Sequence, residues 1–298
     1  MLGGYLLINK AEGFTSFDAL RPIKRLLKSG KVGHTGTLDK FASGLLVVLT
    51  EKALKLSNYF MHCDKSYIGT IKLGVETDTL DPEGSIVRTA PVPQKDDLLA
   101  ALPFYSGGIM QEPPAYSALH INGKRASALA REGKNIEMIP RPVTIHSLEL
   151  LDFSPPFAKI AVSCSSGTYI RSLARDIAAK SGSAGHLVQL ERTKIGNFSS
   201  CDALPQADIC EQTLKKALIP IETPVFEKLS IPTISIDAKT ASLMRHGKTP
   251  DAILSKDTIS VLYAEKSQSA AFFCENDFVA IIENRCQKLC YGFVNANN

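Results

Sequence analysis

The chain has 298 residues, a length that predicts one large domain or two unequal ones. Hydrophobic residues make up 44% of it and charged residues 21%, which is typical of a soluble globular protein and argues against a disordered chain, a coiled coil or a disulfide-rich scaffold. The net charge of +4 is mild for a nucleic-acid-binding protein, in which an isoelectric point above ~9 is the stronger signal.

Short strand-like and helix-like segments alternate through the first three quarters of the chain, without a repeat period, and predict a mixed α/β or α+β domain. The apolar runs 5–9 and 45–49 predict buried strands, and residues 65–74 predict a further strand. The first run ends at Lys10, and no apolar run approaches the ~18 residues of a membrane helix. We therefore expect no signal peptide, no membrane span and a cytoplasmic location.

Two helices are predicted from caps and from apolar residues at helical spacing. Residues 16–29 follow a cap at Thr15 or Ser16, and residues 169–181 follow a cap at Thr168. The expected buried stripes are Phe17, Leu20, Ile23 and Leu27 in the first helix, and Ile170, Leu173, Ala174 and Ile177 in the second.

Residues 103–145 contain Gly-Gly and Pro-Pro pairs and a basic stretch, which predict an insertion that projects from the core. A strand-rich tail follows, with expected strands at 258–263, 271–273 and 278–282. We place a domain boundary near 226–230, which divides the chain into residues 1–228 and residues 229–298.

Metal sites and disulfides are not predicted. The seven cysteines are odd in number, and Cys286 and Cys290 have no second ligand pair at zinc-finger spacing. Asp78, Asp81 and Glu83 lack the spacing of an EF-hand, so we interpret this segment as an acidic turn that leaves a strand.

Positive charge is concentrated at the N-terminus, where residues 1–60 hold more Lys and Arg than Asp and Glu, whereas residues 229–298 are balanced. Such a patch suits a polyanion such as RNA, or it is a solvated surface. The densest polar segment is Lys31–Lys40, whose glycines, imidazole and carboxylate could orient a substrate and supply a nucleophile, or could form a structural turn. It lacks the spacing of a P-loop.

Arg171 stands in the first turn of the predicted helix 169–181. A cation at a helix N-terminus opposes the helix dipole, so a carboxylate or phosphate partner is expected, with simple solvation as the alternative. No Ser-His-Asp order, pair of catalytic carboxylates or dinucleotide-binding motif stands at a convincing spacing.

Taken together, these segments resemble the TruB family of tRNA pseudouridine synthases. Their order and spacing match the family at Gly4–Lys10, Gly13–Ser16, Val32–Asp39, Lys65–Tyr67, Pro113–Ala118, Asn122–Lys124, Ala130–Gly133, Ser166–Asp176 and His186–Leu190. The resemblance implies an α+β (mixed α/β) fold: a pseudouridine synthase catalytic domain with a central mixed sheet, a thumb at 103–145 that binds RNA, and a small β-rich, PUA-like domain at 229–298.

The resemblance also implies three catalytic groups. Asp39 matches the catalytic aspartate, Tyr67 the tyrosine that stacks on uracil and is a candidate base at C5, and Arg171 the arginine paired with the aspartate. Because the isomerisation needs no external reactant, one nucleophile in a dry pocket suffices and no cofactor or metal is expected. A nearby arginine lowers the pKa of an aspartate, so Arg171 is expected to keep Asp39 ionised. Attack at C1′, attack at C6 and a glycal route all stay open.

Five further residues are predicted to bind the substrate. His34 matches the histidine that holds the target nucleotide out of its loop, and Tyr169 and Leu190 match residues that line the base pocket. Lys10 and Lys65 belong to matched segments and are assigned to the same role.

The predicted function is isomerisation of the T-loop uridine at position 55 of tRNA to pseudouridine. The alternatives are a tRNA-binding folding helper that does not depend on catalysis, and the same chemistry on another RNA. The T arm of tRNA is the expected partner, with no obligate protein partner and a monomeric state. One departure from the family pattern is Lys40, which stands where proline follows the catalytic aspartate and could contact phosphate.

Overall fold

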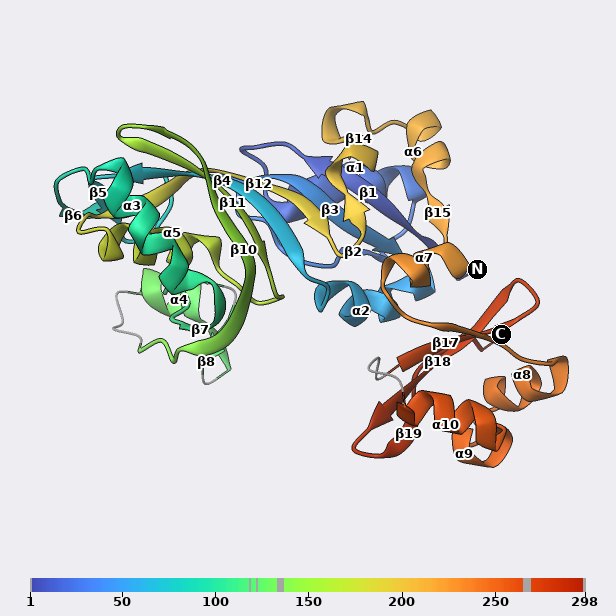
Figure 1. Ribbon diagram of the computed structural model, residues 1–298. Coiled ribbons are helices and arrows are strands. Elements are labelled where there is room, and N and C mark those ends of the chain that lie inside the picture. Colours follow the sequence, from blue (N-terminus) through green and yellow to red (C-terminus); the bar gives the residue numbers. More distant parts are fainter. Residues whose placement is uncertain (1, 118, 122, 133–136, 265–268, 297–298) are drawn as a thin grey trace.

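A computed structural model describes residues 2–296 apart from 118, 122, 133–136 and 265–268 (Figure 1). Ala118, Asn122 and Gly133 of the matched segments therefore lie outside the described residues. One large sheet has the strand order β14-β1-β3-β12-β4-β11-β10-β7, with β2 paired to β3, β13 to β12 and β15 to β1. β1 runs parallel to β14 and β3 parallel to β12, while the other pairs are antiparallel, so the predicted mixed sheet is confirmed.

The strands of this sheet are β1 (Gly4–Lys10), β2 (Val32–His34), β3 (Ser43–Thr50), β4 (Lys65–Leu73), β7 (Gly107–Gln111), β10 (Arg141–Ser154), β11 (Phe157–Cys164), β12 (Gly185–Ile195), β13 (Phe198–Ser199), β14 (Leu204–Pro205) and β15 (Ile219–Pro220). Two small hairpins are formed by β5 (Val75–Thr77) with β6 (Ile86–Thr89) and by β8 (His120–Ile121) with β9 (Lys124–Arg125). The helices up to residue 228 are α1 (Ser16–Leu27), α2 (Ser57–Met61), α3 (Lys95–Ala101), α4 (Ala126–Arg131), α5 (Ile170–Lys180), α6 (Glu211–Ala217) and α7 (Thr223–Lys228).

β3 lies in the middle of the core, because its alternate residues pack on opposite faces of the sheet. Leu46 and Val48 pack against α1, whereas Leu45, Val47 and Leu49 join a cluster that includes α7 and the C-terminal sheet. All five side chains are fully buried. The apolar run that predicted this strand therefore reflects burial on both of its faces.

α1 begins with a capping box in which Thr15 and Asp18 bond reciprocally to backbone amides, so Thr15 is the cap. Leu20 and Ile23 of the predicted stripe are buried. Phe17, however, is 56% exposed, so its place in that stripe is wrong. The face that packs on the sheet is completed by small residues of the first turn instead.

α5 carries the predicted buried stripe, which is confirmed. Its N-cap is Tyr169 and not Thr168, because the Thr168 hydroxyl donates to the carbonyl of Ser165 at 2.9 Å. The side-chain amide of Gln111 replaces a cap: it accepts from the Tyr169 N–H at 2.8 Å and donates to the Tyr169 carbonyl at 3.1 Å. β7 thus fixes the start of α5.

The two ends of the 103–145 segment belong to the large sheet, because β7 pairs with the first residues of β10. The part that leaves the sheet is therefore shorter than 103–145 and comprises residues 112–140, with α4 and the β8–β9 hairpin (Figure 1). Both of its ends leave the sheet near the N-terminus of α5.

The C-terminal part is a sheet of order β16-β17-β18-β19 with helices on one face. Its elements are β16 (Thr233–Ser235), α8 (Ala238–Arg245), α9 (Pro250–Ile253), α10 (Lys256–Ala264), β17 (Ser269–Cys274), β18 (Asp277–Arg285) and β19 (Lys288–Val294). The strand expected at 258–263 is wrong, since these residues lie in α10. The Ser255 hydroxyl accepts from the Thr258 N–H at 3.1 Å, and this cap outweighs the strand propensity of the run.

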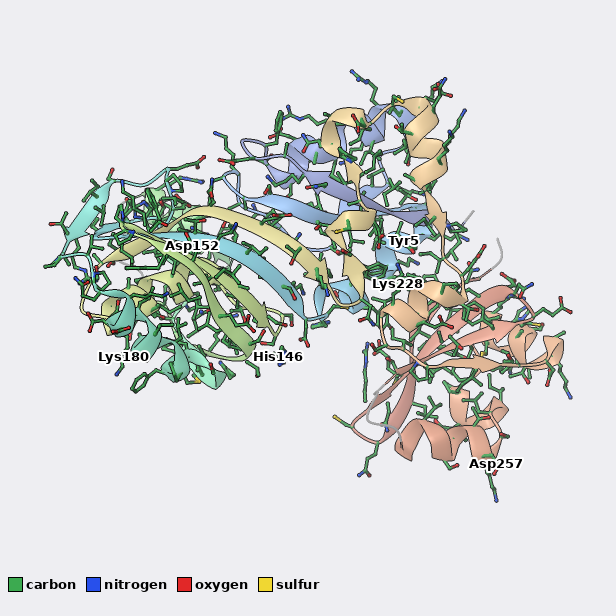
Figure 2. All side chains as sticks on the ribbon, turned by 45° about the horizontal axis from the view of Figure 1, so that its top comes forward. Tyr5, His146, Asp152, Lys180, Lys228 and Asp257 are labelled. Carbon is green, nitrogen blue, oxygen red and sulfur yellow. The ribbon has the colours of Figure 1, made fainter. Side chains whose placement is uncertain are left out.

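An aromatic cluster joins the two parts of the molecule. The ring of Phe226 in α7 lies 4.8 Å from that of Phe278 and 5.5 Å from that of Phe273, both in the C-terminal sheet. Tyr5 and Lys228 lie at this junction (Figure 2). The proposed boundary near 226–230 therefore crosses a continuous hydrophobic core.

Candidate active site

Asp39 lies in the loop between β2 and β3, and hydrogen bonds to α1 and β3 help to hold this loop. The Ser16 hydroxyl accepts from the Leu38 N–H at 2.8 Å and donates to the Leu38 carbonyl at 3.1 Å. The Thr35 N–H donates to the carbonyl of Val47 at 3.0 Å. Since α1 and β3 are rigid parts of the core, the position of Asp39 is set by both of them.

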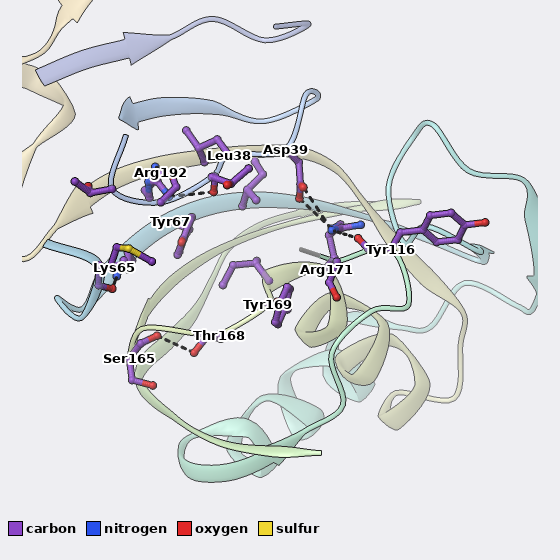
Figure 3. Close-up of a pocket in the computed structure, with 18 residues that line it drawn as sticks. Leu38, Asp39, Lys65, Tyr67, Tyr116, Ser165, Thr168, Tyr169, Arg171 and Arg192 are labelled. Atoms are coloured by element: carbon purple, nitrogen blue, oxygen red, sulfur yellow. Dashed lines mark hydrogen bonds and ion pairs between the residues drawn. The ribbon is translucent and has the colours of Figure 1, made fainter. Parts of the chain in front are cut away.

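A cavity of about 340 Å³ opens beside this loop (Figure 3). It brings together six of the predicted site residues, namely Asp39, Lys65, Tyr67, Tyr169, Arg171 and Leu190. They come from the Asp39 loop, β4, the start of α5 and β12. Elements far apart in the sequence therefore converge on one cavity, whose volume lies within the range of small-molecule sites, ~300–1,000 Å³.

Arg171 makes the central ion pair of the cavity with Asp39. Its Nε lies 3.0 Å from Asp39 Oδ2, and its Nη2 lies 3.4 Å from Oδ1, so both carboxylate oxygens face the guanidinium. Arg171 is buried, whereas 38% of the Asp39 side-chain surface is open to the cavity. The carboxylate partner expected for an arginine at this helix N-terminus is thus Asp39.

A second carboxylate, Asp81, holds the other side of Arg171. Arg171 Nη1 lies 3.3 Å from Asp81 Oδ2, and the guanidinium also donates to the carbonyls of Thr79 at 2.8 Å and Tyr116 at 2.9 Å. Asp81 is 7% exposed. We interpreted this acidic segment only as a turn. A buried aspartate requires a partner, but the sequence does not show which one.

The pKa of Asp39 is raised, so the expectation that Arg171 dominates it is wrong. Burial by the surrounding protein raises the pKa most, the Arg171 guanidinium opposes that rise, and the nearby Asp81 carboxylate adds to it. Arg171 is shared between two carboxylates, which limits what it contributes to either. Asp39 is therefore more basic than an ordinary aspartate, and it loses its charge at a higher pH.

Asp81→Asn should lower the pKa of Asp39, because it removes a negative charge and frees one side of Arg171. Activity that depends on the Asp39 carboxylate is lost as pH falls through its pKa, so the acid limb of the pH–rate profile should move to lower pH. The maximal rate should fall by ~10²-fold, because Arg171 loses an anchor and shifts Asp39. Single-turnover rates across pH measure both effects.

Glu83→Gln is the matched control for this prediction. Glu83 also raises the pKa of Asp39, but it is exposed and pairs with Lys40 at 3.5 Å. The Glu83→Gln variant should keep the maximal rate of the wild type, and it should shift the acid limb of the pH–rate profile less than Asp81→Asn does. An unchanged profile in Asp81→Asn would show that Asp81 does not act through Arg171.

Tyr67 and Tyr169 are the aromatic side chains next to the Asp39–Arg171 pair (Figure 3). Burial raises the pKa of both phenols, so both are neutral near pH 7. Leu190 lines the same cavity and is 8% exposed. The cavity thus offers aromatic rings and apolar side chains around the Asp39–Arg171 pair, as a flat polar base requires; Tyr116 is a third tyrosine among its lining residues.

Arg192 was not predicted and lies beside Tyr67 in the cavity wall (Figure 3). It is 2% exposed and donates to the carbonyls of Leu45 at 2.8 Å, Gly36 at 3.0 Å and Thr37 at 3.5 Å. It therefore ties the Asp39 loop to the sheet and keeps a positive charge near Tyr67. Its position in the sequence gives no local signal of this role, because its partners lie in segments far from it along the chain.

The two predicted lysines are committed to backbone carbonyls. Lys10 is fully buried, does not line the cavity, and donates to the carbonyls of Ala11 at 2.9 Å and Phe14 at 2.6 Å. Lys65 lines the cavity, but it donates to the carbonyls of Cys63 at 2.5 Å and Met61. Burial lowers the pKa of each lysine to about 8. Lys65 therefore stabilises a wall of the site, whereas Lys10 holds the segment between β1 and α1.

His34 is not among the residues that line the cavity, although it stands in β2 directly before the Asp39 loop. Its Nδ1 accepts from the Gly36 N–H at 3.4 Å, and burial lowers its pKa. The imidazole is therefore neutral near pH 7, a form suited to stacking.

Among the described residues, no group of three or more His, Cys, Asp or Glu could hold a metal ion. None of the helices in that part of the chain is long and apolar enough to cross a membrane.

Comparisons with known proteins identify the family of the chain. The family model described as "TruB family pseudouridylate synthase (N terminal domain)" matches residues 24–170. The protein named tRNA pseudouridine synthase B from Borreliella burgdorferi (strain ZS7) is 44% identical over 83% of this chain and 86% of its own length. The protein of that name from Francisella philomiragia is 40% identical over 95% and 91%.

Solved structures show the same fold. The chain aligns over its whole length with 84% of a chain in the crystal structure of a Cbf5-Nop10-Gar1 complex, with a TM-score of 0.70 and 21% identity. A second similarity is to the structure of an H/ACA RNP bound to a substrate RNA containing 2'-deoxyuridine, with a TM-score of 0.68 and 20% identity. At 20–21% sequence identity, these similarities show a shared fold and nothing more specific.

Proposed function

The chain belongs to the TruB family of pseudouridine synthases, and we propose that it converts the T-loop uridine at position 55 of tRNA to pseudouridine. The observation that carries this proposal is the Asp39–Arg171 pair in a cavity bordered by Tyr67. The relatives named tRNA pseudouridine synthase B, at 36–44% identity, support tRNA as the substrate.

The chemistry follows from the arrangement of the cavity. The N1–C1′ glycosidic bond breaks, the base turns, C5 bonds to C1′ and then loses its proton, and N1 takes up a proton, so atoms balance without a cofactor. The Asp39 carboxylate is the only ionised acid that borders the cavity among its described lining residues, and it is the group that reacts with the nucleotide. Arg171 orients it through both oxygens. Flipping the uridine costs a few kcal/mol, and stacking on Tyr67 returns ~1–3 kcal/mol.

Tyr67→Phe should separate stacking from proton removal at C5. The variant keeps the ring but loses the hydroxyl, so tRNA affinity should stay near that of the wild type while the single-turnover rate falls by ~10²–10⁴-fold. A deuterium isotope effect at C5 should increase, because proton removal becomes the slow step. Tyr67→Leu, which also loses the ring, is the comparison and should bind tRNA more weakly. A Phe variant as fast as the wild type would limit Tyr67 to stacking.

Nucleoside analysis tests the proposed function. An unmodified tRNA transcript is incubated with the protein in buffer that contains a chelator and no cofactor. We expect one new pseudouridine per tRNA, in the T loop. Pseudouridine at another position, or none without added metal, would contradict the proposal. The RNA-binding role predicted for the 103–145 insertion, through the part that leaves the sheet, stays a prediction, as do the monomeric state and the cytoplasmic location.

A further inference from the structure

α1 presents an aromatic surface that the core does not use. Phe14 is 48% exposed and Phe17 is 56% exposed, although both are large hydrophobic side chains. The opposite face of α1 buries Leu20 and Ile23 against the sheet. Packing therefore explains one face of α1, but it gives no reason for the exposed Phe17 on that helix or for the exposed Phe14 just before it.

Two cationic side chains lie over the ring of Phe17. Arg21 Cζ lies 5.7 Å from the centroid of the Phe17 ring, and Lys24 Nζ lies 5.0 Å from it. The single acid of α1, Asp18, is occupied: it bonds to Thr15 in the capping box and pairs with Arg21 at 3.2 Å. Residues 16–31 contain five cations against this one acid, namely Arg21, Lys24, Arg25, Lys28 and Lys31.

The surface is continuous with the loop that carries Asp39. The Gly13 N–H donates to the carbonyl of Lys40 at 2.8 Å, and Ser16 is bonded to Leu38 on the other side of Asp39. A polynucleotide whose uridine enters the cavity must run past the rim formed by this loop. Gly13 and Ser16, which contact this loop, directly flank the segment of Phe14 and the first turn of α1, which carries Phe17.

We propose that Phe14, Phe17, Arg21 and Lys24 form a second RNA-contact surface, defined here as the α1 surface. A nucleotide of the substrate tRNA other than the flipped uridine stacks on Phe17, and Arg21 and Lys24 bind the neighbouring phosphates. Exposed aromatic rings interleaved with Lys and Arg are the combination that binds unpaired nucleotides, and the charge favours a polyanion over a neutral protein partner. This inference rests on the proposed function, because it assigns the ligand to the same tRNA.

The test is tRNA affinity in Phe17→Ala and in the double variant Arg21→Gln, Lys24→Gln, measured by filter binding from low to high salt. Phe17→Ala should weaken binding at least about fivefold, and Phe17→Tyr should restore it. The double variant should reduce the slope of log affinity against log salt by about 1.5, since two phosphate contacts are lost. Single-turnover isomerisation at saturating tRNA should stay at the wild-type rate in all three.

The chain contains a matched control in Phe104 and Lys180. Lys180 Nζ lies 3.7 Å from the Phe104 ring centroid, and Phe104 is 62% exposed, so the chemistry is the same. Lys180 is the last residue of α5, at the opposite end of this helix from Arg171, which pairs with Asp39. Phe104→Ala and Lys180→Gln should leave affinity and salt slope unchanged.

Wild-type affinity and salt slope in the α1 variants would overturn the proposal, as would an equal loss in the control variants. A wild-type protein that binds tRNA but forms no pseudouridine would instead contradict the proposed function, so the two failures are distinguishable. Loss of binding to a protein partner without loss of tRNA affinity would assign the α1 surface to that partner.

Discussion

Asp39→Asn is expected to reduce isomerisation by at least about 10⁴-fold, because the amide lacks the charge and the nucleophilicity of the carboxylate that meets the nucleotide. The side chains are nearly equal in size, and 38% of the Asp39 side-chain surface is open to the cavity, so the fold should be unaffected. Affinity for tRNA should stay within a few-fold of the wild type. Single-turnover kinetics and filter binding measure the two quantities separately.

The control is Asp202→Asn, at an exposed aspartate in the 3-10 helix Ser200–Asp202. It should leave both rate and affinity unchanged. The Asp39 variant also distinguishes an enzyme from a tRNA-folding helper. If the inactive Asp39→Asn still improves the folding of tRNA, the protein has a second activity that does not depend on catalysis. Turnover by that variant at a rate near the wild type would remove Asp39 from the reaction.

Arg171→Met should cost both stability and activity. Asp39 and Asp81 would then face each other without the cation that pairs with both. Breaking a buried ion pair by removing one partner costs ~3–5 kcal/mol in the free energy of unfolding. The isomerisation rate should fall by ~10²–10⁴-fold, because Asp39 loses its orientation and more readily binds a proton. Denaturant unfolding and single-turnover rates test the two effects.

The direction in which the pH–rate profile of Arg171→Met moves is a further test of this prediction. Without Arg171 the pKa of Asp39 should rise further, so the acid limb of the pH–rate profile should move to higher pH, opposite to the shift in Asp81→Asn. The acid limb of Arg171→Lys should lie between those of Arg171→Met and the wild type, because a lysine cannot bind both oxygens of Asp39 in the same way. Arg175→Met, one turn later in α5, is the control and should preserve the rate. A wild-type acid limb in Arg171→Met would contradict the role of the ion pair.

The central strands and both long helices of the catalytic part were predictable because their signals are local. The run at 45–49 is buried on both faces of the sheet, and the cap at Thr15 marks the start of α1. The segment 258–263 shows the limit of such signals. Its β-branched residues favour a strand, but a cap at Ser255 and contacts with the C-terminal sheet place it in a helix.

The family resemblance named Asp39, Tyr67 and Arg171, and the structure brings them to one cavity. Asp81 and Arg192 were not predicted, because their roles depend on contacts between distant segments: Asp81 meets Arg171 across 90 positions, and Arg192 meets the carbonyl of Leu45 across 147. The direction of the Asp39 pKa shift also could not be predicted, since it depends on the balance between burial and the shared guanidinium.

Tritium release from a tRNA transcript labelled at uridine C5 tests the central claim most directly, because the C5 hydrogen is replaced during the isomerisation itself. The wild-type protein is compared on two transcripts, one with uridine at position 55 and one with cytidine there. We expect one equivalent of tritium per tRNA from the first transcript and none from the second. Equal release from both transcripts, or no release from the first despite tight binding, would contradict the account.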